Sequence, residues 1–175
     1  MALNPFFEPV DKDKHHLKGF NCGHADMNTF LARYASKNAQ LGLSRTWVLA
    51  EQTTDRNKAA VAAYYTLAVQ SICPEKLIEQ GLPRYPTPVT LLARLAVDIS
   101  YQKQGLGTKT LLAALAQAVR MADRGLPTYA LILDVLDENA LAFYQQFAFF
   151  RPLDDTNRKL FVPLRVIRSL LNSNQ

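Results

Sequence analysis

The stretch YQKQGLGTKTLLAALAQAV, residues 101–119, decides the fold. It opens as a polar turn that contains Gly105 and Gly107, and it continues as a segment with apolar residues at helical spacing. The apolar run VTLLARLAVD, residues 89–98, comes shortly before it and predicts a buried strand. A strand, a glycine turn and a helix outline an anion site, because the first N–H groups of a helix have no partner within the helix.

The segments around this unit predict a mixed sheet flanked by helices, which is an α/β fold class. The hydrophobic spacing predicts helices at 26–40, 105–124, 138–147 and 165–172, and strands at 45–51, 59–69, 89–98, 128–135 and 159–164. The first two strands predict an antiparallel hairpin. The strand–helix–strand unit that follows predicts parallel pairing with a right-handed crossover. Between them, residues 71–88 form a proline-rich connection, and long connections of this kind are often functional.

Length and composition place limits on the class of protein. A chain of 175 residues predicts a single domain spanning 1–175, with 49% hydrophobic residues to build its core. No apolar stretch reaches the roughly 18 residues of a membrane span, and the N-terminus does not resemble a secretory signal. Cys22 and Cys73 lack metal-ligand spacing, so we expect no metal site and a reduced, cytoplasmic protein. The net charge of +5 suits an anionic partner such as nucleic acid or a phosphorylated cofactor.

Three phosphate-binding motifs compete for the glycine turn. A P-loop needs G-x-x-x-x-G-K-[ST], and the chain lacks that spacing. A dinucleotide fingerprint needs a third glycine, where this chain has Thr110. The remaining pattern is Gln102-x-x-Gly105-x-Gly107, and a plain helix-capping turn stays open as an alternative reading.

The Q-x-x-G-x-G pattern, between an apolar strand and an amphipathic helix, resembles the acetyl-CoA pyrophosphate loop of the GCN5-related N-acetyltransferases, the GNAT family. The later segment DENALAFYQQFAFF, residues 137–150, resembles the family segment that ends in F-Y-x-x-x-G-F, with Asn139, Ala142, Phe143 and Tyr144 matched. Ala148 stands where the family has glycine. If that position needs positive φ, alanine costs roughly 1–2 kcal/mol there.

The resemblance implies a GNAT fold in which two parallel strands splay apart and admit the pantetheine arm of acetyl-CoA. It implies that the arm contacts the strand backbone and that the pyrophosphate lies on the loop. The cofactor-binding residues expected on this basis are Leu95, Ala96, Val97, Gln102, Lys103, Gln104, Gly105, Leu106, Gly107, Thr108 and Asn139.

The resemblance also places Tyr144 as the general acid that protonates the leaving thiolate. A phenol with a pKa of about 10 suits a thiol of about 8.5. Many relatives carry a glutamate on the strand before the loop to deprotonate the amine, whereas LLARLAV has no acid, and Asp98 or Glu138 would have to serve. The pKa of a lysine amine is about 3.4 units above pH 7, so its deprotonation costs nearly 5 kcal/mol at that pH. The pKa of an α-amine is only about 1 unit above pH 7. The acid-free strand therefore favours an α-amine acceptor.

A closer resemblance covers nearly the whole chain. Five segments, FNCGHADMNTFL, SRTWVLAE, AAYYTLA, GLPRYPTPVTLLARLAVD and QGLGTKTLL, are similar to GNAT toxins of bacterial type II toxin–antitoxin modules. Such toxins acetylate the α-amine of aminoacyl-tRNA and block translation. The resemblance implies a homodimer and a ribbon-helix-helix antitoxin as partners.

A basic chain suits a tRNA substrate, and the candidate tRNA contacts are basic or aromatic. They are Arg84, Tyr85, Arg94, Arg158, Lys159, Arg165 and Arg168. Two alternatives stay open: a GNAT enzyme that acts on a small-molecule amine or a protein N-terminus, and a non-catalytic acyl-CoA-binding module.

Overall fold

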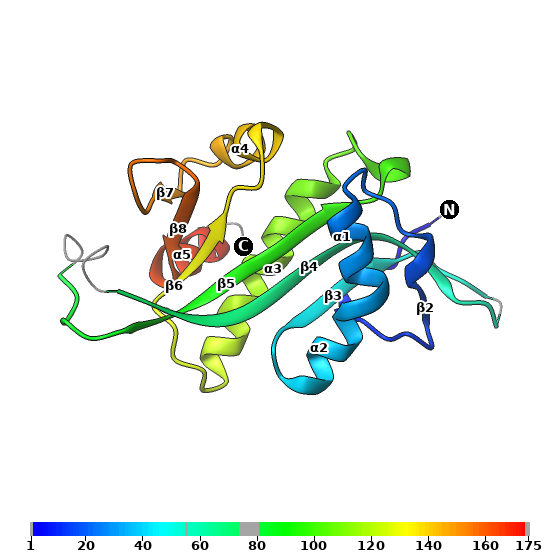
Figure 1. Cartoon of the computed structure of the whole chain (residues 1–175), viewed down its shortest axis with the longest axis horizontal. Coiled ribbons are helices and arrows are strands. Elements are labelled where there is room, and N and C mark those ends of the chain that lie inside the picture. The colour runs from blue at the N-terminus through cyan, green and yellow to red at the C-terminus, as the bar shows by residue number, and fades with distance from the viewer. Residues whose placement is uncertain (1, 55, 74–80, 174–175) are drawn as a thin grey trace. The chain divides into compact units, whose positions relative to one another are not determined.

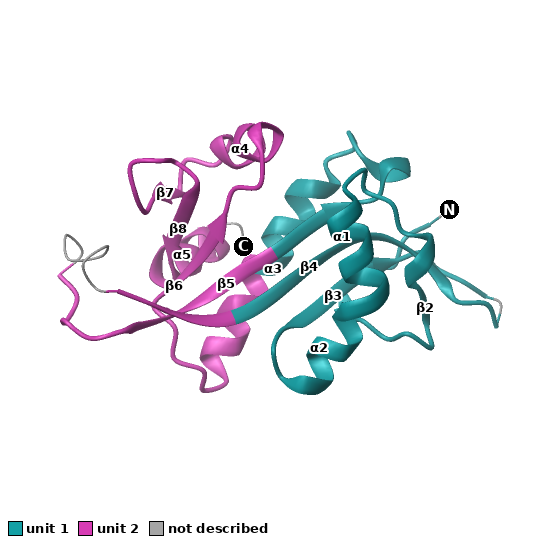
Figure 2. Cartoon of the chain, in the orientation of Figure 1, with its two compact units in different colours: residues 1–68, 94–114 teal, residues 69–93, 115–175 magenta. Residues whose placement is uncertain are grey.

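The structure, a computed structural model, describes residues 2–54, 56–73 and 81–173. The chain divides into two compact units (Figure 2). Unit 1 comprises residues 1–68 and 94–114, and unit 2 comprises residues 69–93 and 115–175. The boundaries between the units fall within two strands and the longest described helix, so each of these elements has residues in both units.

The strands of the described residues join in the order β1-β3-β4-β5-β6-β8-β7, with β2 paired to β4 (Figure 1). Their bounds are β1 Glu8–Pro9, β2 His15–His16, β3 Arg45–Ala50, β4 Ala59–Ile72, β5 Thr87–Val97, β6 Ala130–Asp134, β7 Arg151–Pro152 and β8 Lys159–Pro163. β3 and β4 are antiparallel, which confirms the predicted hairpin. β5 and β6 are parallel, as the strand–helix–strand unit predicted. The sheet is therefore mixed.

The four predicted helices all lie where the sequence placed them, but the first is divided into three segments. The observed helices are α1 Ala25–Thr29, a π-helical turn Phe30–Tyr34, α2 Ala35–Leu41, α3 Leu106–Asp123, α4 Glu138–Gln145 and α5 Leu164–Ser173. The predicted helix 26–40 thus contains a π-helical turn in its middle, which helical periodicity does not reveal. Such turns occur frequently at functional sites.

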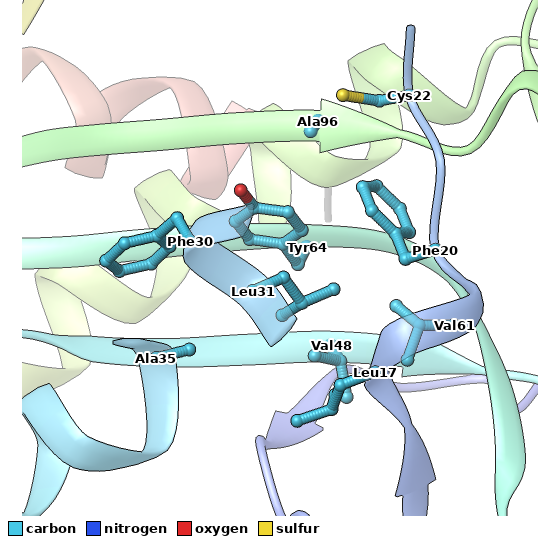
Figure 3. Packing of buried hydrophobic residues seen from close by; sticks show 10 residues of the cluster. All are labelled: Leu17, Phe20, Cys22, Phe30, Leu31, Ala35, Val48, Val61, Tyr64 and Ala96. Carbon is cyan, nitrogen blue, oxygen red and sulfur yellow. The ribbon is translucent and has the colours of Figure 1, made fainter. Parts of the chain in front are cut away.

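The core of unit 1 forms where α1, the π-helical turn and α2 cover β3 and β4 (Figure 3). Leu31, Val48 and Tyr64 are fully buried there. The ring of Phe20 meets the ring of Tyr64 edge-on at 5.3 Å, and the ring of Phe30 stacks on it at 6.4 Å. These aromatic contacts fix the π-helical turn over β4.

A second cluster of unit 1 holds the start of α3. Leu106, in the first turn of the helix, is buried in one cluster with Leu49, Ala62 and Ala63 of β3 and β4. Tyr101, from the turn before α3, packs against this cluster. The helix that follows the glycine turn is therefore anchored at its first residue.

Unit 2 has its own core, in which Val89, Ala130, Ile132 and Phe161 pack together. Asp137 caps α4, since its Oδ1 accepts a hydrogen bond from the N–H of Ala140 at 2.8 Å. This cap confirms the start that the sequence predicted for the helix carrying Tyr144.

Several boundaries differ from the prediction. β4 continues to Ile72 and β5 begins at Thr87, so the ends of the predicted 71–88 connection belong to strands. Residues 74–80 of that connection lie outside the described residues. The two-residue strands β1, β2 and β7 were missed, because so short a strand shows no alternation in the sequence. No helix in the described part of the chain is both long and apolar enough to cross a membrane.

A buried pair of threonines on β3 and β4 offers a test of this packing. The Oγ1 atoms of Thr46 and Thr66 lie 2.7 Å apart, and both residues are fully buried. We expect Thr46→Val to lower the free energy of unfolding by about 1–3 kcal/mol, because it leaves the hydroxyl of Thr66 without its partner. The double variant Thr46→Val/Thr66→Val removes both hydroxyls and should recover most of that loss. Urea unfolding followed by circular dichroism measures the free energy of unfolding of each variant. The prediction would be contradicted if the double variant lost at least as much of it as Thr46→Val and Thr66→Val together.

Candidate active site

The turn between β5 and α3 is tied to the N-terminal arm of unit 1. Oδ2 of Asp98 accepts a hydrogen bond from the N–H of Asn21, and Oδ1 accepts one from the N–H of Ser100, both at 2.9 Å. The Gln102 amide donates to the carbonyls of Val97 at 2.8 Å and Cys22 at 3.1 Å. The side chain of Gln102 therefore holds the turn in place, which the motif alone did not show.

Two residues of the turn take left-handed backbone conformations. Lys103 has φ 64° and Gly105 has φ 79°. A Cβ atom built on Gly105 would meet no atom within 4 Å, so this position needs glycine for its backbone angle and not for space. The structure thus brings residues 102–108 together as one turn that leads into the first residues of α3.

This turn has the chemistry of an anion site. The first N–H groups of α3, those of Leu106, Gly107 and Thr108, precede the first possible i→i−4 hydrogen bond, which Lys109 makes to Gly105 at 3.2 Å. The dipole of an 18-residue helix adds positive potential at this end. The residues expected to hold the pyrophosphate of acetyl-CoA therefore fit that group.

The described pairing between β5 and β6 is short. The register pairs Thr90 with Leu131 and Leu91 with Ile132, and no later residue of β5 has a partner on β6 within the described register. β6 nevertheless continues to Asp134, paired with β8. The described register therefore pairs none of residues 95–97 with β6.

Arg94 of β5 lies among apolar groups of unit 1. Its guanidinium carbon is 4.2 Å from the centre of the Phe30 ring, and Nη1 is 3.7 Å from Sδ of Met27. The Tyr64 hydroxyl donates to the Met27 carbonyl at 2.8 Å. Burial raises the pKa of Tyr64, although the charge of Arg94 opposes the rise. Tyr64 is therefore a neutral phenol at physiological pH, and no acid among the described residues forms an ion pair with Arg94.

A pocket of about 630 Å³ opens in unit 1 beside the turn. Glu51 and Asp98 supply its carboxylates, and Gln104 is the residue that it shares with the expected pyrophosphate loop. The Tyr101 hydroxyl donates a hydrogen bond to Glu51. Burial and then that bond raise the pKa of Tyr101 to about 12. No sequence pattern predicted this pocket, because its lining residues come from segments far apart in the chain.

Tyr144 lies on α4 in unit 2 and is 8% exposed. Its ring meets the rings of Phe143 and Phe150 edge-on, at 5.1 and 5.6 Å. Burial raises its pKa, so the side chain carries its proton at neutral pH, as a general acid must. Asn139, in the first turn of the same helix, is exposed.

Ala148 does not adopt the left-handed conformation that would have strained it. Among the described residues other than glycine, only Lys103 and Asn157 have positive φ. The replacement of the family glycine by alanine therefore brings no φ penalty to the turn after α4.

Apart from Arg94, the basic candidates for substrate binding fall into two groups. Arg158, Lys159 and Arg168 form ion pairs with acids of unit 2, namely Glu138, Asp134 and Asp123. Within the described ranges, Arg84 and Arg165 have no such pair and are exposed, as is Tyr85. The side chains of the second group can contact a phosphate without first breaking an ion pair. The ion pair with Arg158 also occupies Glu138, one of the two acids that the sequence analysis considered as a general base.

Comparison with known proteins gives concordant results. Residues 75–149 match the acetyltransferase (GNAT) family. The chain is 31% identical over 140 residues to a tRNA-acetylating toxin of Mycobacterium tuberculosis, covering 78% of this chain and 80% of that protein. It is 25% identical over 181 residues to a probable toxin TacT of Sinorhizobium fredii, covering 97% of each.

Solved structures show the same likeness at full length. A mutant of KacT superposes with a TM-score of 0.84 at 26% identity, covering 97% of this chain and 99% of that one. AtaT complexed with acetyl-methionyl-tRNAfMet superposes with a TM-score of 0.81 at 27% identity, with the same coverage. AtaT has also been solved as a tyrosine-to-phenylalanine mutant with acetyl-CoA and the C-terminus of the antitoxin AtaR, at a TM-score of 0.80 and 26% identity, covering 98% and 99%. This chain belongs to the GNAT family of acetyltransferases.

The left-handed angle at Gly105 generates a prediction for the donor site. Gly105→Ala places a Cβ on a left-handed residue at a cost of about 1–2 kcal/mol, and the exposed turn can relieve it by moving. We expect the affinity for acetyl-CoA to fall about 5- to 30-fold, because such a movement misaligns the N–H groups. Isothermal titration calorimetry measures the affinity. Gln117→Ala, an exchange in the middle of α3, is the control, and unchanged affinity in Gly105→Ala would contradict the role of the turn.

Proposed function

We propose that this acetyltransferase transfers the acetyl group of acetyl-CoA to the α-amine of an aminoacyl-tRNA and acts as the translation-blocking toxin of a toxin–antitoxin module. The observation that carries the proposal is the full-length likeness to a toxin solved with acetyl-methionyl-tRNA. The 31% identity to a tRNA-acetylating toxin supports it independently.

The residues of this chain can be assigned to the steps of the reaction. Acetyl-CoA supplies the acetyl group as a thioester. Residues 102–108 bind its pyrophosphate, and Leu95–Val97 offer backbone groups to its arm and a backbone N–H to the carbonyl oxygen. The amine nitrogen forms the new C–N bond, the C–S bond breaks, and Tyr144 gives its proton to the departing sulfur. The amine releases a proton to solvent.

The partners follow from the same likeness. AtaT was solved with the antitoxin AtaR, and KacT with its antitoxin on DNA. We infer a cognate antitoxin of the ribbon-helix-helix type, a homodimer and a cytoplasmic location for this chain. The unpaired basic residues Arg84 and Arg165 are the proposed contacts to tRNA phosphates, together with Tyr85. Arg158 and Lys159 can join them only by exchanging their present ion pairs.

Expression without an antitoxin tests the toxin proposal. We expect wild-type protein to arrest bacterial growth and Tyr144→Phe to relieve the arrest at equal protein level, because phenylalanine keeps the packing and removes the proton. Phe143→Tyr, which leaves Tyr144 in place, is the matched control and should still arrest growth. Full arrest by Tyr144→Phe would contradict its role as the acid.

A labelling experiment identifies the acceptor. Purified protein is incubated with radioactive acetyl-CoA in separate reactions with charged tRNA, with deacylated tRNA, and with a tRNA-free bacterial extract that contains small amines and proteins. We expect label on charged tRNA alone, released with the amino acid on mild base treatment. Label on a small amine or on protein N-termini, with none on charged tRNA, would favour the alternative GNAT activity.

A further inference from the structure

The proposed reaction requires a neutral amine, and unit 1 offers no obvious base to produce one. The residues LLARLAV of β5 include no acid. Asp98, the first acid after them, has both oxygens engaged by the N–H groups of Asn21 and Ser100. Glu51 accepts the hydrogen bond of Tyr101. In the described part of unit 1, the acids nearest the end of β5 therefore serve as caps and hydrogen-bond partners.

Arg94 occupies this face of β5 with its charge uncompensated. Phe30 covers one side of the guanidinium and Met27 contacts Nη1, whereas no described carboxylate lies within ion-pair distance. The residue is only partly exposed, so solvent screens its charge incompletely. Its side chain shares a strand face with that of Ala96, about 7 Å further along the strand.

The other ionisable groups around this face add little charge. Tyr64 on β4 and Cys22 in the N-terminal arm are neutral, since burial raises the pKa of each. His24 and Asp26, at the start of α1, are exposed to solvent. The carboxylate of Asp26 is next in the chain to Met27 and opposes Arg94 from an exposed position, whereas the carboxylate of Asp98, after the end of β5, accepts backbone N–H groups with both oxygens. The field on this face is therefore dominated by Arg94.

We propose that Arg94 favours the neutral form of the acceptor α-amine, so that the enzyme obtains its nucleophile by repelling the ammonium form instead of by a general base. The inference rests on the proposed function, because it needs an α-amine that meets the acetyl group at the end of β5. A cation lowers the pKa of a second cation nearby. At about 7 Å, the spacing of residues 94 and 96 along the strand, and an effective dielectric constant of about 20 to 80, the amine pKa falls by about 0.4 to 1.7 pH units.

The test is the pH profile of kcat, which reports ionisation in the enzyme–substrate complex. The probes are acetyl-CoA and unfractionated bacterial aminoacyl-tRNA, both saturating, with initial rates taken between about pH 5.5 and pH 8.5. We expect Arg94→Gln to move the acidic limb of the kcat profile to higher pH by about 0.4 to 1.7 units and to approach the wild-type rate at the alkaline plateau. Arg94→Lys keeps the charge and should keep the wild-type limb.

Two further variants serve as controls. Arg45→Gln removes the same charge from an exposed position on β3 and should leave the limb in place. Arg94→Met is a second neutral variant, should the glutamine not fold, and its limb should move in the same direction as that of Arg94→Gln.

The opposite results are equally clear. Two results with Arg94→Gln would overturn the inference: a kcat lowered by the same factor at every pH, or a higher KM for tRNA with the acidic limb of kcat unmoved. Either would leave Arg94 as a packing or phosphate-binding residue. If wild-type enzyme labelled no charged tRNA, the proposed function would fall and this inference with it. An unmoved limb with an active wild type would overturn this inference alone.

Discussion

The carboxylate of Asp98 makes the contacts on which the turn between β5 and α3, the proposed donor site, depends. By accepting hydrogen bonds from Asn21 and Ser100, it joins the N-terminal arm to the end of β5 and caps the turn that leads into residues 102–108. Gln102 adds bonds from the same turn to the carbonyls of Val97 and Cys22. A loop must be held in this way to present N–H groups to a phosphate, because a mobile loop would lose that alignment.

The proposed donor and acceptor sites use different parts of the chain. The proposed donor site consists of backbone groups, namely those of the turn, of the first residues of α3 and of the end of β5. The proposed acceptor site in unit 1 consists of side chains, in which Phe30 and Met27 contact the guanidinium of Arg94. Backbone recognition suits a donor that GNAT enzymes share, whereas side chains can vary with the acceptor. The π-helical turn belongs to the proposed acceptor site, since it carries Phe30.

Much of the fold and part of the site could be predicted from local patterns. The hairpin of β3 and β4, the β5–α3–β6 unit and the cap of α4 all leave a local signal of alternation, helical spacing or capping residue. The strands β1, β2 and β7 leave none, because two residues show no period. The motif around Gln102 predicted a phosphate-binding turn but not what the side chain contacts. Its amide donates to carbonyls 5 and 80 residues away in the chain.

By itself, the sequence determined the mixed α/β architecture, the position of the glycine turn before α3 and the absence of an acid on LLARLAV, because spacing and residue type encode these directly. Only the tertiary structure decided that Arg94 stacks on Phe30 without an ion pair, that Asp98 is a cap, and that Ala148 needs no positive φ. These depend on contacts between segments distant in the chain, such as Met27 with Arg94, and on backbone angles that residue types alone do not fix.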